Sequence, residues 1–167
     1  PHASAEVAAA RFAEGFSAVK FDPAGQYKVY DGRMPDLEAI AQSVAFCREI
    51  RAAVGDRADM LFGTHGQFTA AGALRLARQL EPFDPLWFEE PCPPDMPEEM
   101  AKVAAGTSIP VATGERLCSK FEFARVLDLG AAAILQPDLG RAGGILEGKK
   151  IAAMAETRYV QVAPHLY

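Results

Sequence analysis

The chain has 167 residues, of which half are hydrophobic and about a quarter are charged, so it is long enough for one domain with a buried core. Its net charge of −5 and its lack of any long basic run exclude the usual signature of binding to nucleic acid or to an anionic membrane surface. No apolar stretch approaches the ~20 residues that cross a bilayer, and three dispersed cysteines without CxxC spacing favour a reducing, cytoplasmic location.

Short apolar runs alternate with amphipathic, alanine- and leucine-rich segments along the whole chain. In chain order the pattern predicts a helix at 4–15, a strand at 16–22, a helix at 36–55, a strand at 58–63, a helix at 69–80, a strand at 86–89, a helix at 97–106, a strand at 109–115, a helix at 119–130, a strand at 131–138, a helix at 143–156 and a strand at 159–165. Strands that alternate with helices of ten or more residues indicate βαβ units and therefore a parallel sheet.

The spacing of these strands favours an α/β barrel. From the second strand onward, successive strand ends are about 25 residues apart, which is steadier than the spacing of a doubly wound sheet. A complete barrel of this kind needs roughly 200 residues or more. We therefore expect residues 1–167 to form a partial catalytic barrel domain with about six strands, whose first and last units lie outside this sequence. An open six-stranded α/β sheet is the alternative.

Ionisable or polar side chains stand at or just after every predicted strand end: Lys20, Asp22, His65, Gln67, Glu89, Glu90, Glu115, Arg116, Asp138 and His165. Active-site groups of a parallel barrel come from the carboxyl ends of its strands and the loops that follow. Turn and helix-cap preferences explain an aspartate at such a position, but they do not explain two glutamates, a lysine and two histidines. The long loop at 23–35 is expected to help cover a substrate.

Glu89 and Glu115 are the two candidate metal ligands. Neighbouring strands lie ~4.8 Å apart, so two carboxylates at adjacent strand ends can converge on one ion. Mg²⁺ prefers a few carboxylates together with water and substrate oxygens. A lysine and a histidine on opposite sides of that cation fit the abstraction of a proton α to a carboxylate.

At these residues the sequence resembles the enolase superfamily, in its mandelate racemase/muconate lactonizing enzyme branch, and within it the acid-sugar dehydratases. The resemblance rests on an ordered set of motifs that covers residues 16–165: AVKFDP, THGQ, WFEEP, PVATGERL, LQPDLGRAGGI, EGKKIAAMAE and APH. It implies a (β/α)7β TIM-like barrel with a capping domain that is not in this sequence, a Mg²⁺ cofactor, a sugar-acid substrate and a homo-oligomer.

The resemblance also assigns roles to individual residues. Glu89 and Glu115 match the metal ligands of the fourth and fifth strands. Asp138 and His165 match a dyad in which the aspartate orients the imidazole. Lys20 matches the first lysine of a Lys-x-Lys pattern and His65 matches a histidine of several acid-sugar dehydratases, so both are expected to be catalytic. From their place at the strand ends, Arg116 and Gln67 are expected to bind the substrate. Glu90 is expected to be a structural neighbour that pairs with a lysine or arginine, and Trp87 is expected to lie in the core.

Two positions depart from the family pattern. Gly63 stands where the family has its first metal ligand, an aspartate, and glycine has no side chain with which to bind a metal. Asp22 stands where the second lysine of Lys-x-Lys is expected, which disfavours a two-lysine racemase. The expected reaction is the elimination of water from a sugar acid to give a 2-keto-3-deoxy acid, the reaction of a carbon-oxygen lyase. There are two alternatives: a racemase or epimerase of the same branch, and a metal-impaired relative without catalysis.

Overall fold

A computed structural model describes residues 2–24 and 34–166 as six strands and six α-helices. The strands form one parallel sheet in which each strand pairs with the next along the chain: β1 (Ala18–Phe21), β2 (Asp59–Gly63), β3 (Trp87–Glu89), β4 (Val111–Thr113), β5 (Ile134–Leu135) and β6 (Gln161–Val162). The predictions of six strands and of a parallel sheet are therefore confirmed. Residues 25–33, most of the loop that was expected to cover a substrate, lie outside the described residues.

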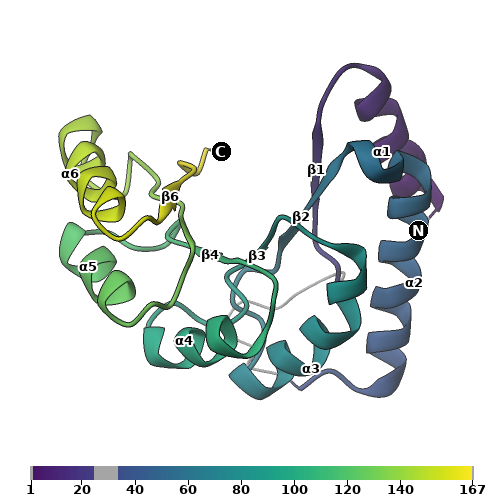
Figure 1. Ribbon diagram of the computed structural model, residues 1–167, viewed down its shortest axis with the longest axis horizontal. Helices are drawn as coiled ribbons and strands as arrows, with labels where there is room; N and C mark the ends of the chain where they lie inside the picture. Colours follow the sequence, from purple (N-terminus) through teal and green to yellow (C-terminus); the bar gives the residue numbers. More distant parts are fainter. Residues whose placement is uncertain (1, 25–33, 167) are drawn as a thin grey trace.

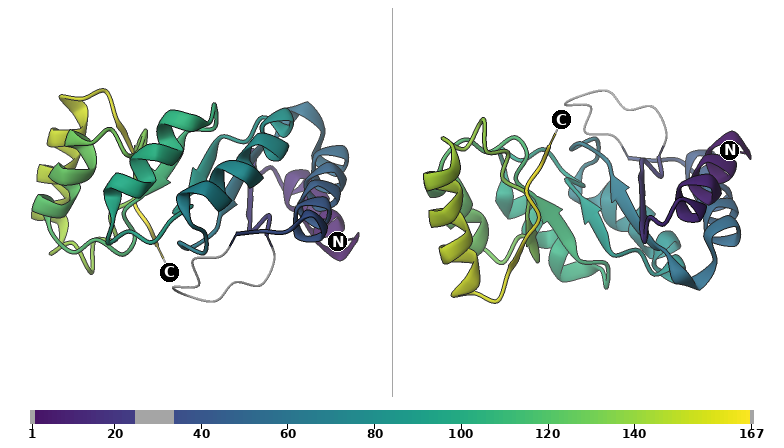
Figure 2. Two further views of the ribbon diagram at one scale, coloured as in Figure 1. Left: turned by 90° about the horizontal axis from the view of Figure 1, so that it is seen from below. Right: turned by 90° about the horizontal axis from the view of Figure 1, so that it is seen from above.

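The helices lie along one side of the curved sheet, as in a segment of a barrel wall (Figure 1). They are α1 (His2–Ala13), α2 (Leu37–Val54), α3 (Ala70–Leu80), α4 (Pro97–Gly106), α5 (Lys120–Asp128) and α6 (Ile145–Glu156), with short 3₁₀ turns at Gly55–Arg57 and Glu81–Phe83. Seen from below, α3 and α4 lie in front of the sheet, and the view from above shows the strands themselves (Figure 2). None of the helices in the described ranges is long and apolar enough to cross a membrane.

Local sequence signals set the helix ends. Asp36 accepts a hydrogen bond from the Ala39 backbone N–H at 2.8 Å, so it caps the start of α2 one residue before the helix begins. Ser119 and Glu122 form a reciprocal capping box at the start of α5. The core lies between the helices and the sheet, and its largest fully buried side chains include Phe62 and Phe88. The buried core holds the strands in place, and with them the residues at their carboxyl ends.

The last two predicted strands are shorter than expected. β5 pairs only at Ile134–Leu135, although 131–138 was predicted, and β6 pairs only at Gln161–Val162, although 159–165 was predicted. Pro137 and Pro164 follow these pairs, and proline has no N–H to donate to a ladder. Pairing resumes at an isolated parallel bridge between Asp138 and His165, where the His165 N–H donates to the Pro137 carbonyl at 3.1 Å. The two residues of the predicted dyad are thus aligned by the backbone.

Candidate active site

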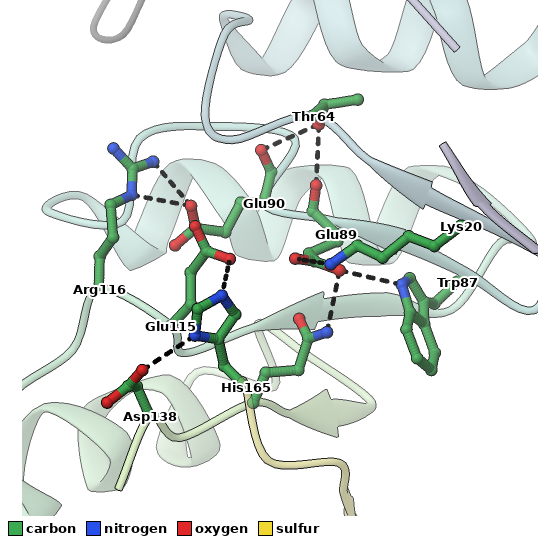
Figure 3. A network of polar contacts seen from close by, with 10 residues as sticks. Lys20, Thr64, Trp87, Glu89, Glu90, Glu115, Arg116, Asp138 and His165 are labelled. Atoms are coloured by element: carbon green, nitrogen blue, oxygen red, sulfur yellow. Dashed lines mark hydrogen bonds and ion pairs between the residues drawn. The ribbon is translucent and has the colours of Figure 1, made fainter. Parts of the chain in front are cut away.

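The carboxyl ends of the strands bring together five side chains that the sequence predicted to be metal ligands or catalytic residues (Figure 3). These are Lys20 on β1, Glu89 on β3, and Glu115, Asp138 and His165, which follow β4, β5 and β6. They form two connected sets, one centred on the Glu89 carboxylate and one on the His165 imidazole. Glu115 lies near both sets: its Oε2 is 3.5 Å from His165 Nε2, and its carboxyl group helps to lower the pKa of Glu89.

Glu89 is the most enclosed of these groups, with 1 % of its surface exposed. Its Oε1 lies 2.7 Å from Lys20 Nζ, and its Oε2 accepts hydrogen bonds from Trp87 Nε1 at 3.2 Å and Gln136 Nε2 at 3.0 Å. Burial opposes ionisation, but the hydrogen bonds from Lys20 and Gln136 and the charge of Lys20 outweigh it and hold the pKa of Glu89 below its usual value. Glu89 is therefore a buried carboxylate that stays ionised.

Trp87 and Gln136 were not predicted as site residues. Trp87 was expected in the core, but its side chain is only half-buried, and its indole N–H donates to Glu89. Strand alternation contained a signal, because residues i and i+2 of a strand point to the same face, and Trp87 precedes Glu89 by two residues. Gln136 lies in the QPD motif, but its contact with Glu89 joins residues 47 positions apart, which local sequence does not reveal.

His165 lies between two carboxylates. Its Nδ1 is 3.0 Å from Asp138 Oδ2, and its Nε2 is 3.5 Å from Glu115 Oε2. Asp138 also accepts a hydrogen bond from the Arg141 backbone N–H at 3.0 Å. The hydrogen bond with His165 lowers the pKa of Asp138 most, and the hydrogen bond from Arg141 lowers it further. The contact with Asp138 holds the imidazole in place and leaves Nε2 facing the Glu89–Glu115 pair.

Glu90 belongs to a different set of contacts from Glu89. It is fully buried, and its Oε2 accepts a hydrogen bond from Arg116 Nε at 2.8 Å, which confirms the expected pair with a lysine or arginine. Arg116 Nη2 also donates to the His65 carbonyl at 3.1 Å, and the Gly66 N–H donates to the Glu90 carbonyl at 2.6 Å. Arg116 thus ties the turn that follows β2 to the end of β3. Substrate binding by Arg116 stays a prediction.

We expect the full-length protein to lose stability with rising pH as Glu90 ionises, and we expect Glu90→Gln to lose less. Burial raises the pKa of Glu90 from 4.5 to about 7 against the opposing effect of Arg116, so the folded protein binds an extra proton between these values. Stability falls with rising pH wherever the folded state binds more protons, so this contribution is present below pH 4.5 and is lost as the pH passes about 7.

The measurement is the free energy of unfolding in urea across this range. Glu98→Gln is the matched control, because the hydrogen bond from Arg125 lowers the pKa of this half-buried glutamate and its titration falls below the range. The wild-type protein and Glu98→Gln should lose stability with rising pH, and Glu90→Gln should lose less. Equal slopes for all three proteins would show that Glu90 titrates normally.

His65 and Gln67 lie on the turn after β2. His65 has a positive φ of 54° and is linked to Glu90 through its carbonyl and Arg116. Gln67 is fully buried, and its Nε2 donates to the Asp22 carboxylate at 3.2 Å, so it bridges the ends of β1 and β2. A catalytic role for His65 and substrate binding by Gln67 stay predictions.

Gly63 lies next to Glu89 across the β2–β3 pair. A Cβ atom added to Gly63 would lie 2.9 Å from Lys20 Cε and 4.0 Å from Glu89 Oε2, so the Lys20 side chain fills the space of a side chain at position 63. Within residues 2–24 and 34–166, no group of three or more His, Cys, Asp or Glu side chains is arranged to hold a metal ion. A three-carboxylate site is not present in this part of the chain.

The two remaining carboxylates still fit a hard divalent cation. Both Glu89 and Glu115 are buried at the carboxyl ends of adjacent strands, and Glu115 is close enough to affect the pKa of Glu89. Gln136 Oε1 is buried and has no hydrogen-bond partner among the described residues, so it is a further oxygen beside Glu89. Mg²⁺ is commonly bound by one or two carboxylates and completes its shell with water and substrate oxygens. Glu89 and Glu115 are therefore the residues that could hold it.

Comparisons with known proteins identify the family of this chain. Residues 3–167 match the enolase C-terminal domain-like family. The chain is 44 % identical over 153 residues to a D-galactonate dehydratase of Ralstonia nicotianae, and 44 % identical over 151 residues to one of Xanthomonas axonopodis pv. citri. These matches cover 92 % and 90 % of this chain but only 39 % and 38 % of the relatives.

A solved structure of a mandelate racemase/muconate lactonizing enzyme-like protein from Roseovarius sp. TM1035 is 65 % identical in sequence and superposes with a TM-score of 0.94. The match covers 98 % of this chain and 41 % of that one. These similarities confirm the resemblance predicted from the motifs and the expectation that the chain is part of a larger barrel fold.

Proposed function

This chain belongs to the enolase C-terminal domain-like family, and from that membership we propose that it carries the active site of a Mg²⁺-dependent dehydratase that removes water from a sugar acid. One observation carries the proposal: the carboxylate pair Glu89–Glu115 lies between the Lys20 ammonium group and the His165–Asp138 dyad. The similarity to D-galactonate dehydratases supports a sugar acid as the substrate and elimination of water as the reaction.

The proposed reaction needs a base, an acid and a positive charge. The proton on the carbon α to the carboxylate is removed, hydroxide leaves the β carbon with a proton, and the resulting enol becomes a 2-keto-3-deoxy acid. His165 Nε2 takes the α proton or protonates the leaving hydroxide, because Nδ1 is engaged by Asp138. Lys20 acts from the opposite side, as electrostatic partner of the substrate carboxylate or as the second proton carrier.

The cation would be held by Glu89 and Glu115. When bound, Mg²⁺ supplies positive charge that lowers the energy of the negative charge developing on the substrate carboxylate. Two buried carboxylates at the ends of adjacent strands support a cation at this position.

The test is a screen of hexonates and hexarates, D-galactonate among them, for release of a 2-keto-3-deoxy acid by the full-length protein with Mg²⁺. At least one sugar acid is expected to give a keto acid, and chelation of Mg²⁺ is expected to abolish the release. Exchange or inversion of the α proton without a keto acid would instead identify a racemase or epimerase. No reaction with any member of the library would favour a relative without catalysis.

We also propose a cytoplasmic location and a homo-oligomer. The three cysteines, Cys47, Cys92 and Cys118, are free thiols, which suits a reducing compartment. Large apolar side chains are exposed on α5 and α6, among them Phe121, Ile145 and Leu146, and such side chains are typical of contact surfaces. Light scattering of the full-length protein measures the oligomeric state.

A further inference from the structure

We infer that Lys20 and a divalent cation compete for Glu89, so that binding of the cation releases the Lys20 ammonium group from Glu89 toward the substrate. This inference rests on the proposed function, because it assumes that Glu89 and Glu115 hold the cation. It adds a coupling between the metal site and the lysine, in which the lysine pairs with Glu89 until a cation binds and then becomes a substrate-facing group.

The competition follows from how the two oxygens of Glu89 are used. Oε2 already accepts hydrogen bonds from Trp87 and Gln136, so Oε1 is the oxygen that remains for a cation. Lys20 Nζ lies on that oxygen, at 2.7 Å. An ammonium group and a divalent cation on one buried oxygen repel each other strongly, because little water screens them there. One of the two must leave.

Gly63 explains how Lys20 reaches Glu89. Lys20 is on β1, Glu89 is on β3, and β2 lies between these two strands. Gly63 is the residue of β2 that pairs with Glu89, and the stem of Lys20 passes over it: a Cβ atom there would lie 2.9 Å from Lys20 Cε. Real Cβ contacts are not this short, so even an alanine would force the end of the lysine to move. The absence of a side chain at position 63 therefore leaves room for the Lys20 stem in its path to Glu89.

Release of Lys20 requires no rearrangement of the core. The Lys20 side chain is 42 % exposed, whereas that of Glu89 is 1 % exposed. The lysine can therefore swing away into the open end of the site while Glu89 stays in place, held by Trp87 and Gln136. A long, flexible lysine side chain reaches several positions from one backbone site. The released ammonium group remains beside the strand ends, where the carboxylate of a sugar acid would lie.

The test measures Mn²⁺ affinity, by calorimetry or electron paramagnetic resonance, in the full-length wild-type protein, Gly63→Ala, Lys20→Met and the double variant. Gly63→Ala leaves every charge unchanged and displaces the end of the Lys20 side chain beside Glu89, so it is expected to weaken the ion pair and tighten Mn²⁺ binding about tenfold. Lys20→Met is expected to tighten it by at least as much, and the double variant no further than Lys20→Met. Lys150→Met is the matched control, because it removes a lysine paired with Glu147 outside the site.

Distinct results would overturn the inference and the proposed function. Tighter binding in Lys20→Met but not in folded Gly63→Ala would show a general effect of charge. Weaker binding in Lys20→Met would show that the lysine helps the metal to bind. Either result overturns the competition between Lys20 and the cation but leaves the metal site in place. No Mn²⁺ binding in any of the four proteins would overturn the metal site itself.

A second measurement does not depend on the folding of Gly63→Ala. The rate of reductive methylation of each lysine in the wild-type protein, followed by mass spectrometry with and without Mg²⁺, reports how accessible each amine is. Mg²⁺ is expected to speed the labelling of Lys20 several-fold and to leave Lys150 unchanged. Slower or unchanged labelling of Lys20 in protein that binds Mg²⁺ would contradict its release.

Discussion

Replacing His165 by asparagine is expected to lower the rates of α-proton exchange and of water elimination by about 10²- to 10⁴-fold, the usual contribution of a positioned general acid or base. The imidazole is held by Asp138 at Nδ1 and faces Glu115 with Nε2, so Nε2 is the atom that exchanges the proton. Asparagine is close to the imidazole in size and can still donate a hydrogen bond to Asp138, but it cannot take up a proton.

The measurement is the loss of the α-proton NMR signal in D₂O, with the full-length protein and the sugar acid identified by the screen. Mn²⁺ binding should remain in His165→Asn, because Glu89 and Glu115 are unchanged, and this separates the loss of the base from the loss of the metal. An exchange rate within a factor of about two of the wild-type rate would contradict the assignment of His165 as the base that takes the α proton, and an unchanged rate of water elimination as well would contradict its role as the acid.

Replacing Glu89 by glutamine is expected to weaken Mg²⁺ binding by at least about 100-fold and to abolish keto-acid release. Glu89 is one of only two carboxylates assigned to the metal, and a neutral amide loses the charge that attracts it. The change also removes the counter-ion of Lys20. Because the Lys20 side chain is 42 % exposed and can return to water, we expect stability to fall by about 1–2 kcal/mol rather than by the ~3–5 kcal/mol typical of a fully buried pair.

Calorimetry with Mg²⁺ and urea unfolding of the full-length protein measure these two effects. Glu147→Gln is the matched control: it removes a glutamate that pairs with Lys120 and Lys150 on the helices, and it should leave Mg²⁺ binding unchanged. Wild-type Mg²⁺ affinity in Glu89→Gln would remove Glu89 from the metal site, and with it the reason for the proposed competition with Lys20.

Much of the fold could be predicted from local sequence. The apolar runs before Gly63 and Glu89 predicted two neighbouring strands, and Asp36 predicted the start of α2 to within one residue, because backbone hydrogen bonding and helix capping depend on nearby residues. The prolines at 137 and 164 were also visible, but their effect on strand length was missed. It depends on which backbone groups a neighbouring strand presents, and that is a property of the assembled sheet.

The candidate residues could be named from the sequence, but their partners could not. Chain order and the common direction of parallel strands determined that Lys20, Glu89 and His165 would stand at one end of the sheet. Only the tertiary structure decided that Lys20 passes over Gly63 to Glu89, that Trp87 supports the same carboxylate, and that Arg116 is engaged by Glu90. The physical reason is that such contacts depend on strand register, side-chain rotamers and burial between residues far apart in the chain.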